Sequence, residues 1–101
     1  MSHVLSVGNL KEIPPGQSKL VKFGEFGIVL FNVEGTIYAI ENCCPHSGGP
    51  LGKGELQGNI VSCPWHQWRF DITSGQSIDF PEECVKQFEV KIEGKKIKLL
   101  L

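Results

Sequence analysis

Two short segments, Cys44-Pro45-His46 and Cys63-Pro64-Trp65-His66, decide how the rest of this sequence is interpreted, and sixteen residues separate them. Each segment carries one cysteine and one histidine two or three residues apart. Glycine and proline crowd the stretch from residue 41 to residue 76, which indicates irregular loops there rather than long regular elements. We therefore expect two loops of similar make-up to bring four potential metal ligands together.

Two sulfur and two nitrogen donors suit two kinds of metal site. One is a single tetrahedral zinc ion, and the other is a two-iron cluster in which each loop gives its cysteine to one iron and its histidine to the other. Cys44 and His46 have one residue between them, fewer than the roughly two to four that usually separate paired zinc ligands. This short step suits ligands that must reach two different irons, although spacing alone separates the two kinds of site only in part.

Length and composition exclude several classes of protein. The chain has 101 residues, so we expect one domain over residues 1–101. Ten basic and eleven acidic residues give a formal net charge of −1, which offers no electrostatic attraction to nucleic acid. The apolar runs reach four residues at most, far short of the about 20 that cross a bilayer, and no export-signal pattern opens the sequence. We expect no nucleic-acid or membrane partner and a cytoplasmic location, where cysteine binds metal more often than it forms disulfides.

Short runs of β-forming residues that alternate with polar ones predict an all-β fold, and no long stretch has the apolar period of a helix. Glu34-Gly35 and Glu93-Gly94 predict hairpin turns. Lysines around the last hairpin are interpreted as charges that protect a sheet edge from aggregation. The predicted strands are 4–7, 19–23, 27–33, 36–41, 59–63, 68–72, 85–92 and 96–100.

The two Cys/His segments, together with Trp68-Arg69-Phe70-Asp71 and Thr73-Ser74-Gly75, resemble the motif of Rieske [2Fe–2S] proteins. The resemblance implies a small antiparallel β-sandwich or barrel with an inserted cluster-binding subdomain of two loops, about residues 42–76 here. It implies one [2Fe–2S] cluster per chain, with Cys44 and Cys63 on the inner iron and His46 and His66 on the outer one. Cys43 is a competing thiol, and the family spacing favours Cys44 over it.

Residues that differ from the high-potential respiratory Rieske type indicate which relatives the chain is most similar to. The resemblance aligns the two further cysteines of that type, which pair in a disulfide, with Gly49 and Trp65, and it aligns two hydroxyl donors with Trp68 and Phe70. Loss of these donors predicts a potential at the low end of the Rieske range of roughly −150 to +300 mV. The sequence is therefore similar to the stand-alone ferredoxins of ring-hydroxylating dioxygenase systems.

That resemblance implies an electron carrier rather than an enzyme. Nothing in the sequence resembles a substrate pocket with its own general base or nucleophile, and no glycine-rich dinucleotide fingerprint follows a predicted strand. The implied partners are a flavin-dependent ferredoxin reductase and a terminal oxygenase or similar oxidoreductase. Two alternatives stay open: the small subunit of a nitrite reductase-type complex, and a structural Cys₂His₂ zinc module. We expect the docking face at the tip of the two loops, with Pro50-Leu51 and Trp65 as candidate apolar contacts.

Overall fold

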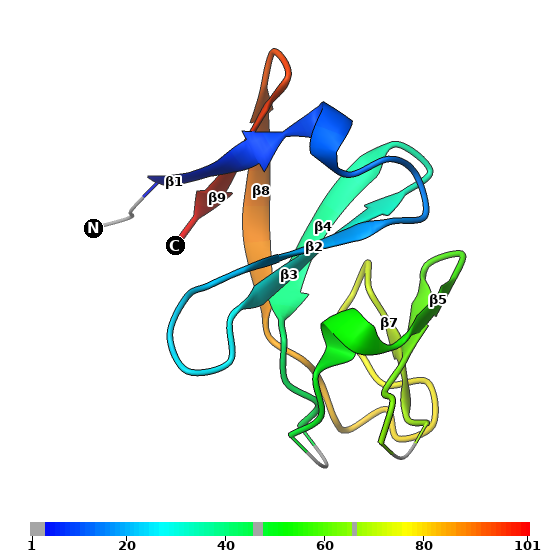
Figure 1. Cartoon of the computed structure of the whole chain (residues 1–101). Coiled ribbons are helices and arrows are strands. Elements are labelled where there is room, and N and C mark those ends of the chain that lie inside the picture. The colour runs from blue at the N-terminus through cyan, green and yellow to red at the C-terminus, as the bar shows by residue number, and fades with distance from the viewer. Residues whose placement is uncertain (1–3, 46–47, 66) are drawn as a thin grey trace.

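A large curled sheet carries the first and last strands of the chain and forms most of the molecule (Figure 1). The structure is a computed structural model that describes residues 4–45, 48–65 and 67–101. The six strands pair throughout antiparallel, in the order β1-β9-β8-β4-β3-β2. Their bounds are β1 Val4–Asn9, β2 Ser18–Val21, β3 Ile28–Val33, β4 Thr36–Glu41, β8 Gln87–Glu93 and β9 Lys96–Leu100.

A smaller sheet lies against the large one and has the order β5-β6-β7 (Figure 1). Its strands are β5 Glu55–Gln57, β6 Ile60–Ser62 and β7 Arg69–Asp71, and two 3₁₀ turns, η1 Leu10–Glu12 and η2 Leu51–Lys53, complete the described elements. The predicted all-β class is therefore confirmed. Strand β5 was not predicted, because a three-residue strand with one apolar side chain between Gly54 and Gly58 does not differ from a loop in sequence.

Strand β3 explains how the two sheets share the interior. Ile28 and Leu30 belong to a core cluster inside the curled sheet, whereas Val29 and Phe31 belong to a second cluster shared with the small sheet. Successive strand residues point to opposite faces, so a strand that is buried on both faces needs an unbroken apolar run. This is why the sequence has four consecutive apolar residues at Ile28–Phe31, all no more than 1% exposed.

The two edges of the large sheet are joined by one lysine side chain. Lys19 on β2 donates from Nζ to the carbonyl oxygen of Val7 on β1 at 2.9 Å and to Glu12 Oε1 at 2.7 Å. The edge strands β1 and β2 thereby meet across the curl of the sheet. The interpretation of the C-terminal lysines as edge protection was wrong, because β9 lies between β1 and β8 and neither β8 nor β9 is an edge.

Both predicted hairpins are present. Glu34 and Gly35 have φ angles of 51° and 92°, the left-handed pair typical of a type I′ turn. At the second hairpin Glu93 pairs with Lys96, so the turn residues are Gly94 and Lys95, one position later than predicted. Gly94 has a φ of 64°, which glycine adopts without strain.

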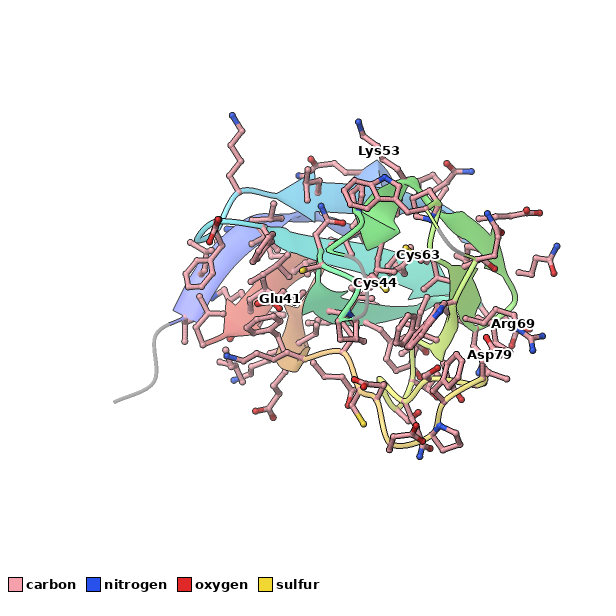
Figure 2. The ribbon with its side chains drawn as sticks, turned by 90° about the horizontal axis from the view of Figure 1, so that it is seen from below. Glu41, Cys44, Lys53, Cys63, Arg69 and Asp79 are labelled. Atoms are coloured by element: carbon pink, nitrogen blue, oxygen red, sulfur yellow. The ribbon has the colours of Figure 1, made fainter. Side chains whose placement is uncertain are left out.

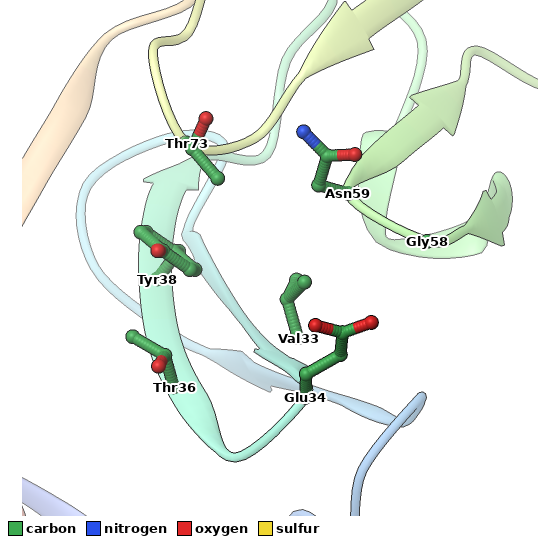
Figure 3. Close-up of a pocket in the computed structure, with 7 residues that line it drawn as sticks. All are labelled: Val33, Glu34, Thr36, Tyr38, Gly58, Asn59 and Thr73. Carbon is green, nitrogen blue, oxygen red and sulfur yellow. The ribbon is translucent and has the colours of Figure 1, made fainter.

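The two sheets diverge at one end. A cavity of about 320 Å³ lies between the β3–β4 hairpin and the small sheet, with Tyr38 on one side and Asn59 and Thr73 on the other (Figure 3). Of the residues that the structure describes in the two Cys/His segments, none lines this cavity. Cys44 and Cys63 belong instead to the core cluster that the two sheets share.

Candidate metal centre

The two predicted cysteine ligands come from different sheets. The first cysteine loop, residues 44–49, follows β4 of the large sheet, and the second cysteine loop, residues 63–68, joins β6 to β7 of the small sheet. Cys44 is 1% exposed and Cys63 is 0% exposed, and both belong to the core cluster between the sheets. Figure 2 shows the two side chains next to each other in the middle of the molecule.

The backbones of the two cysteine loops repeat the same hydrogen-bond pattern. The carbonyl of Cys44 accepts from the N–H of Gly48 at 2.7 Å, and the N–H of Cys44 donates to the carbonyl of Gly49 at 2.9 Å. In the second loop, Cys63 accepts from the N–H of Gln67 at 2.9 Å and donates to the carbonyl of Trp68 at 2.7 Å. The backbone of each cysteine is thus held by residues four and five positions later, in equivalent turns.

The fourth residue after each cysteine has a left-handed backbone. Gly48 has a φ of 77°, and Gln67, which is exposed, has a φ of 60°. The sequence analysis did not single out Gln67, because a glutamine gives no sign of positive φ. An alignment of the two loops on their cysteines would have shown it, since Gln67 then falls on Gly48.

Because Gly49 has no side chain, its backbone can lie close to the thiol of Cys63. A Cβ atom built on Gly49 would lie 2.8 Å from the Sγ of Cys63 and 3.2 Å from the ring atoms Cγ and Cδ2 of Trp65. A side chain at this position would therefore press on the thiol. The two buried thiols and the side-chain-free backbone beside Cys63 fit an iron–sulfur cluster, whose sulfides approach loop backbone closely.

The two predicted histidine ligands, His46 and His66, lie outside the described residues. Among the residues that the structure does describe, no three His, Cys, Asp or Glu side chains gather in a way that could hold a metal ion.

Cys43 differs from Cys44 in its surroundings. Its side chain is only half-buried, and its Sγ lies 3.8 Å from the carbonyl oxygen of Cys44. Burial raises the pKa of the Cys43 thiol, and the nearby carboxylate of Glu41 adds to this effect. None of the four cysteines, all of which are described, is in a disulfide, and Cys84 is exposed at the surface.

Asn42 anchors the first cysteine loop from the strand that precedes it. Its backbone N–H donates to the carbonyl of Gly27 at 3.0 Å, and its side-chain Oδ1 accepts from the N–H of Gly52 at 2.7 Å. A Cβ atom on Gly54 would collide with the carbonyl oxygen of Ser62, the residue before Cys63. The segment after the first loop therefore packs directly on the strand that leads into the second.

Aromatic and charged side chains support the second cysteine loop from outside. Trp68 stacks on Phe80 with 4.1 Å between ring centroids. Arg69 forms an ion pair with Asp79, with 2.8 Å between Nη2 and Oδ1, and Figure 2 shows the pair at the rim of the molecule. The hydrogen bond from the Arg69 side chain holds the pKa of Asp79 below its ordinary value.

The candidate docking residues have different environments. Trp65 is 59% exposed, whereas Leu51 is fully buried in the core cluster between the sheets. The expectation that Leu51 offers an apolar contact at the surface was wrong. Its sequence position, after Pro50 at the start of a 3₁₀ turn, gave no sign that the turn points its side chain inward.

Comparison with known proteins identifies the family. Residues 3–89 match the Rieske [2Fe–2S] domain, and this chain belongs to that family. A protein of Ralstonia sp. named as the ferredoxin component of naphthalene 1,2-dioxygenase/salicylate 5-hydroxylase systems is 38% identical over 91 residues, which are 89% of this chain and 88% of that protein. The family membership gives the chain one Rieske-type [2Fe–2S] cluster.

Solved structures have the same fold. A chain from the complex of reduced oxygenase and oxidized ferredoxin in carbazole 1,9a-dioxygenase has a TM-score of 0.88 and 26% identity, and the match covers 95% of this chain and 91% of that one. A chain of Mycobacterium tuberculosis, described provisionally as the small subunit of an NADH-dependent nitrite reductase, has a TM-score of 0.88, with 19% identity and coverage of 100% of this chain and 96% of that one. This second likeness shows the fold alone.

Within the part of the chain that the structure describes, no helix is both long enough and apolar enough to span a membrane.

Proposed function

We propose that this protein is a one-electron carrier, the ferredoxin component of an oxygenase system. The observation that carries the proposal is the pair of buried cysteines held by equivalent turns in a chain of the Rieske family. Relatives along nearly the whole chain are named as ferredoxin components of dioxygenase systems. The chain is thus an electron-transfer component rather than an enzyme that converts a substrate.

We propose Cys44 and Cys63 as the inner-iron ligands and His46 and His66 as the outer-iron ligands. When bound, the cluster supplies a one-electron redox couple whose potential the His ligands raise above that of all-cysteine clusters. The core packing of Cys44 and Cys63 supports this assignment, and the turn hydrogen bonds from Gly48 and Gln67 hold the backbone at each cysteine. The cluster-binding part of a single domain over 1–101 then corresponds to residues 42–76.

We propose two protein partners for the carrier. The first is a terminal oxygenase, supported by the likeness to a ferredoxin solved in complex with an oxygenase. The second is a flavin-dependent reductase that supplies the electron. A cytoplasmic location agrees with four cysteines that form no disulfide.

A nitrite reductase-type complex is the second candidate, because a chain described as such a small subunit has the same fold. The two candidates differ in the partner that accepts the electron. Reoxidation of the reduced protein by a purified aromatic-ring oxygenase, but not by a nitrite reductase large subunit, is the result expected for the ferredoxin. The opposite selectivity would contradict the proposed partner while leaving the cluster in place.

The cluster and its ligands can be tested on anaerobically purified protein. We expect about two irons and two sulfides per chain, and an EPR signal of low average g value after dithionite reduction. One zinc ion, no sulfide and no visible absorption would replace this proposal with the structural zinc module.

Cys43 offers a matched control for the ligand assignment. Cys44→Ser is expected to abolish the cluster, because it removes a buried thiolate ligand, whereas Cys43→Ser is expected to keep it. The reverse outcome would assign ligation to Cys43. The midpoint potential of the wild-type protein is expected below about +100 mV, because Trp68 and Phe70 cannot donate the hydrogen bonds of hydroxyl groups.

A further inference from the structure

An exposed indole connects the two cysteine loops. Trp65 belongs to the second loop and is 59% exposed, yet its ring atoms Cγ and Cδ2 lie 3.2 Å from the Cβ position of Gly49 in the first loop. That same position lies 2.8 Å from the Sγ of Cys63. The thiol of Cys63 and the indole ring therefore both crowd the side-chain side of Gly49, which is buried although it belongs to a loop.

This contact depends on the residue types at both positions. The ring can approach the Gly49 backbone only because that residue has no side chain, since a Cβ atom would be closer than ordinary van der Waals contact to both neighbours. A smaller residue than tryptophan at position 65 would leave the outer face of Gly49 open to water. None of the four cysteines is in a disulfide, so no covalent bond joins the two loops.

We propose that Trp65 is a positioning residue that braces the two cysteine loops and excludes water from the Cys63 side of the cluster, and thereby lowers the reduction potential and slows cluster loss. The inference rests on the proposed function, because it needs a cluster held by Cys63. It adds a role for a residue that is not itself a ligand.

The direction of the potential shift follows from electrostatics. With two thiolates and two neutral imidazoles, one added electron makes the site one charge more negative. Water stabilises that extra charge better than an indole ring does, because the apolar shell around a metal site controls its dielectric environment. Removal of the ring therefore favours the reduced state.

The direction of the stability effect follows from the packing. The ring of Trp65 covers the backbone of the opposite loop, so its loss lets the two loops separate more easily. Chelator and water then reach the Cys63 side of the site sooner. An exposed tryptophan that served only as a contact for a partner protein would change neither property in the isolated protein.

The test compares Trp65→Ala and Trp65→Phe with Phe23→Ala, which removes another exposed aromatic side chain, 45% exposed, from the β2–β3 loop. The measurements are the midpoint potential and the rate at which excess EDTA bleaches the oxidised protein. For Trp65→Ala we expect the equilibrium constant for reduction to rise about threefold, which is about 28 mV at about 59 mV per decade, and bleaching to be about fivefold faster.

Trp65→Phe keeps a ring over Gly49 and is expected to fall between the wild type and Trp65→Ala, and Phe23→Ala is expected to match the wild type. A Trp65→Ala variant that is folded by circular dichroism but assembles no cluster, while Trp65→Phe does, also supports the brace. Wild-type potential and bleaching rate in Trp65→Ala would overturn it. A wild-type protein without iron and sulfide would instead overturn the proposed function, so the two failures are distinguishable.

Discussion

Gly49 and Gly48 allow a substitution experiment that separates pressure on the thiol from backbone strain. In Gly49→Ala the new methyl carbon would lie 2.8 Å from Cys63 Sγ, whereas nonbonded carbon atoms prefer about 3.5 to 4.0 Å and sulfur is larger still. The thiol or the loop must therefore move by about 0.7 Å or more. The same methyl carbon would also lie 3.2 Å from the ring atoms Cγ and Cδ2 of Trp65, so the indole crowds it as well as the thiol.

Overpacking of this kind costs about 1 to 3 kcal/mol, a factor of about 5 to 150 in an equilibrium constant. The cost falls on the position of the Cys63 sulfur, the proposed ligand, because Gly49 has no left-handed φ and alanine adds no backbone strain there. We therefore expect Gly49→Ala to lower the iron and sulfide content per folded chain. The assay is metal and sulfide analysis of purified protein, together with urea unfolding of the apoprotein.

Gly48→Ala is the matched control, since it adds the same methyl group one residue earlier. A Cβ atom there meets no atom of the described residues within 4 Å, but the φ of 77° is left-handed and costs alanine about 1 to 2 kcal/mol. We expect this variant to lose apoprotein stability while its cluster content per folded chain stays normal. Equal loss of cluster in both variants, or normal content and potential in Gly49→Ala, would refute the reasoning.

Three other side chains allow similarly direct tests. Gln67→Gly should stabilise the apoprotein by up to about 1 kcal/mol in urea unfolding. Relief of the left-handed strain exceeds the conformational entropy that glycine adds to the unfolded chain. A loss of stability would show that the Gln67 side chain contributes contacts. Lys19→Met should lower the free energy of unfolding by about 1 kcal/mol in the same assay. The Val7 carbonyl loses its hydrogen-bond donor across the sheet edges, while an apolar side chain of similar length is kept. Unchanged stability would mean that solvent fully replaces the hydrogen bond to Val7. The Thr73 hydroxyl is the largest cause of the lowered pKa of Asp71. The stabilisation of the fold by the charged Asp71 carboxylate is present above the ordinary carboxyl pKa of about 4 and disappears as pH falls through the pKa of the folded protein. The difference in unfolding free energy between wild type and Asp71→Asn should therefore shrink below about pH 4. A difference independent of pH would contradict the assignment to the charged form.

Most of the strands could be predicted, because the alternation of β-forming and polar residues is a local pattern. Alternating β-forming residues mark β4 and β9 with the observed bounds. The unbroken apolar run in β3 is also a local pattern, but the reason why both of its faces are buried cannot be found locally. Burial of Ile28 and Val29 on opposite faces depends on the small sheet, which is assembled from residues far along the chain.

The features that could not be predicted depend on three-dimensional arrangement. Leu51 turns inward because η2 packs over the core, and the lysines near β9 lie beside an internal strand because β1 pairs with β9 from the far end of the chain. Gln67 adopts a left-handed φ because the hydrogen bond to Cys63 requires the turn, whatever residue stands there. Strand order and turn geometry are set by pairing between distant segments, so a local pattern does not contain them.

The placement of the two cysteines links the metal centre to the fold. Cys44 and Cys63 are members of the same core cluster as Phe31 and Phe70, so the side chains that pack the sheets together also fix the thiols. The described members of the other cluster, inside the curled sheet, include no cysteine, and that half of the molecule has an apolar core of its own. Where metal ligands come together only in the folded chain, the free energy of metal binding adds to the free energy of folding. A cluster held by these two cysteines, as proposed above, would therefore stabilise mainly the contact between the sheets.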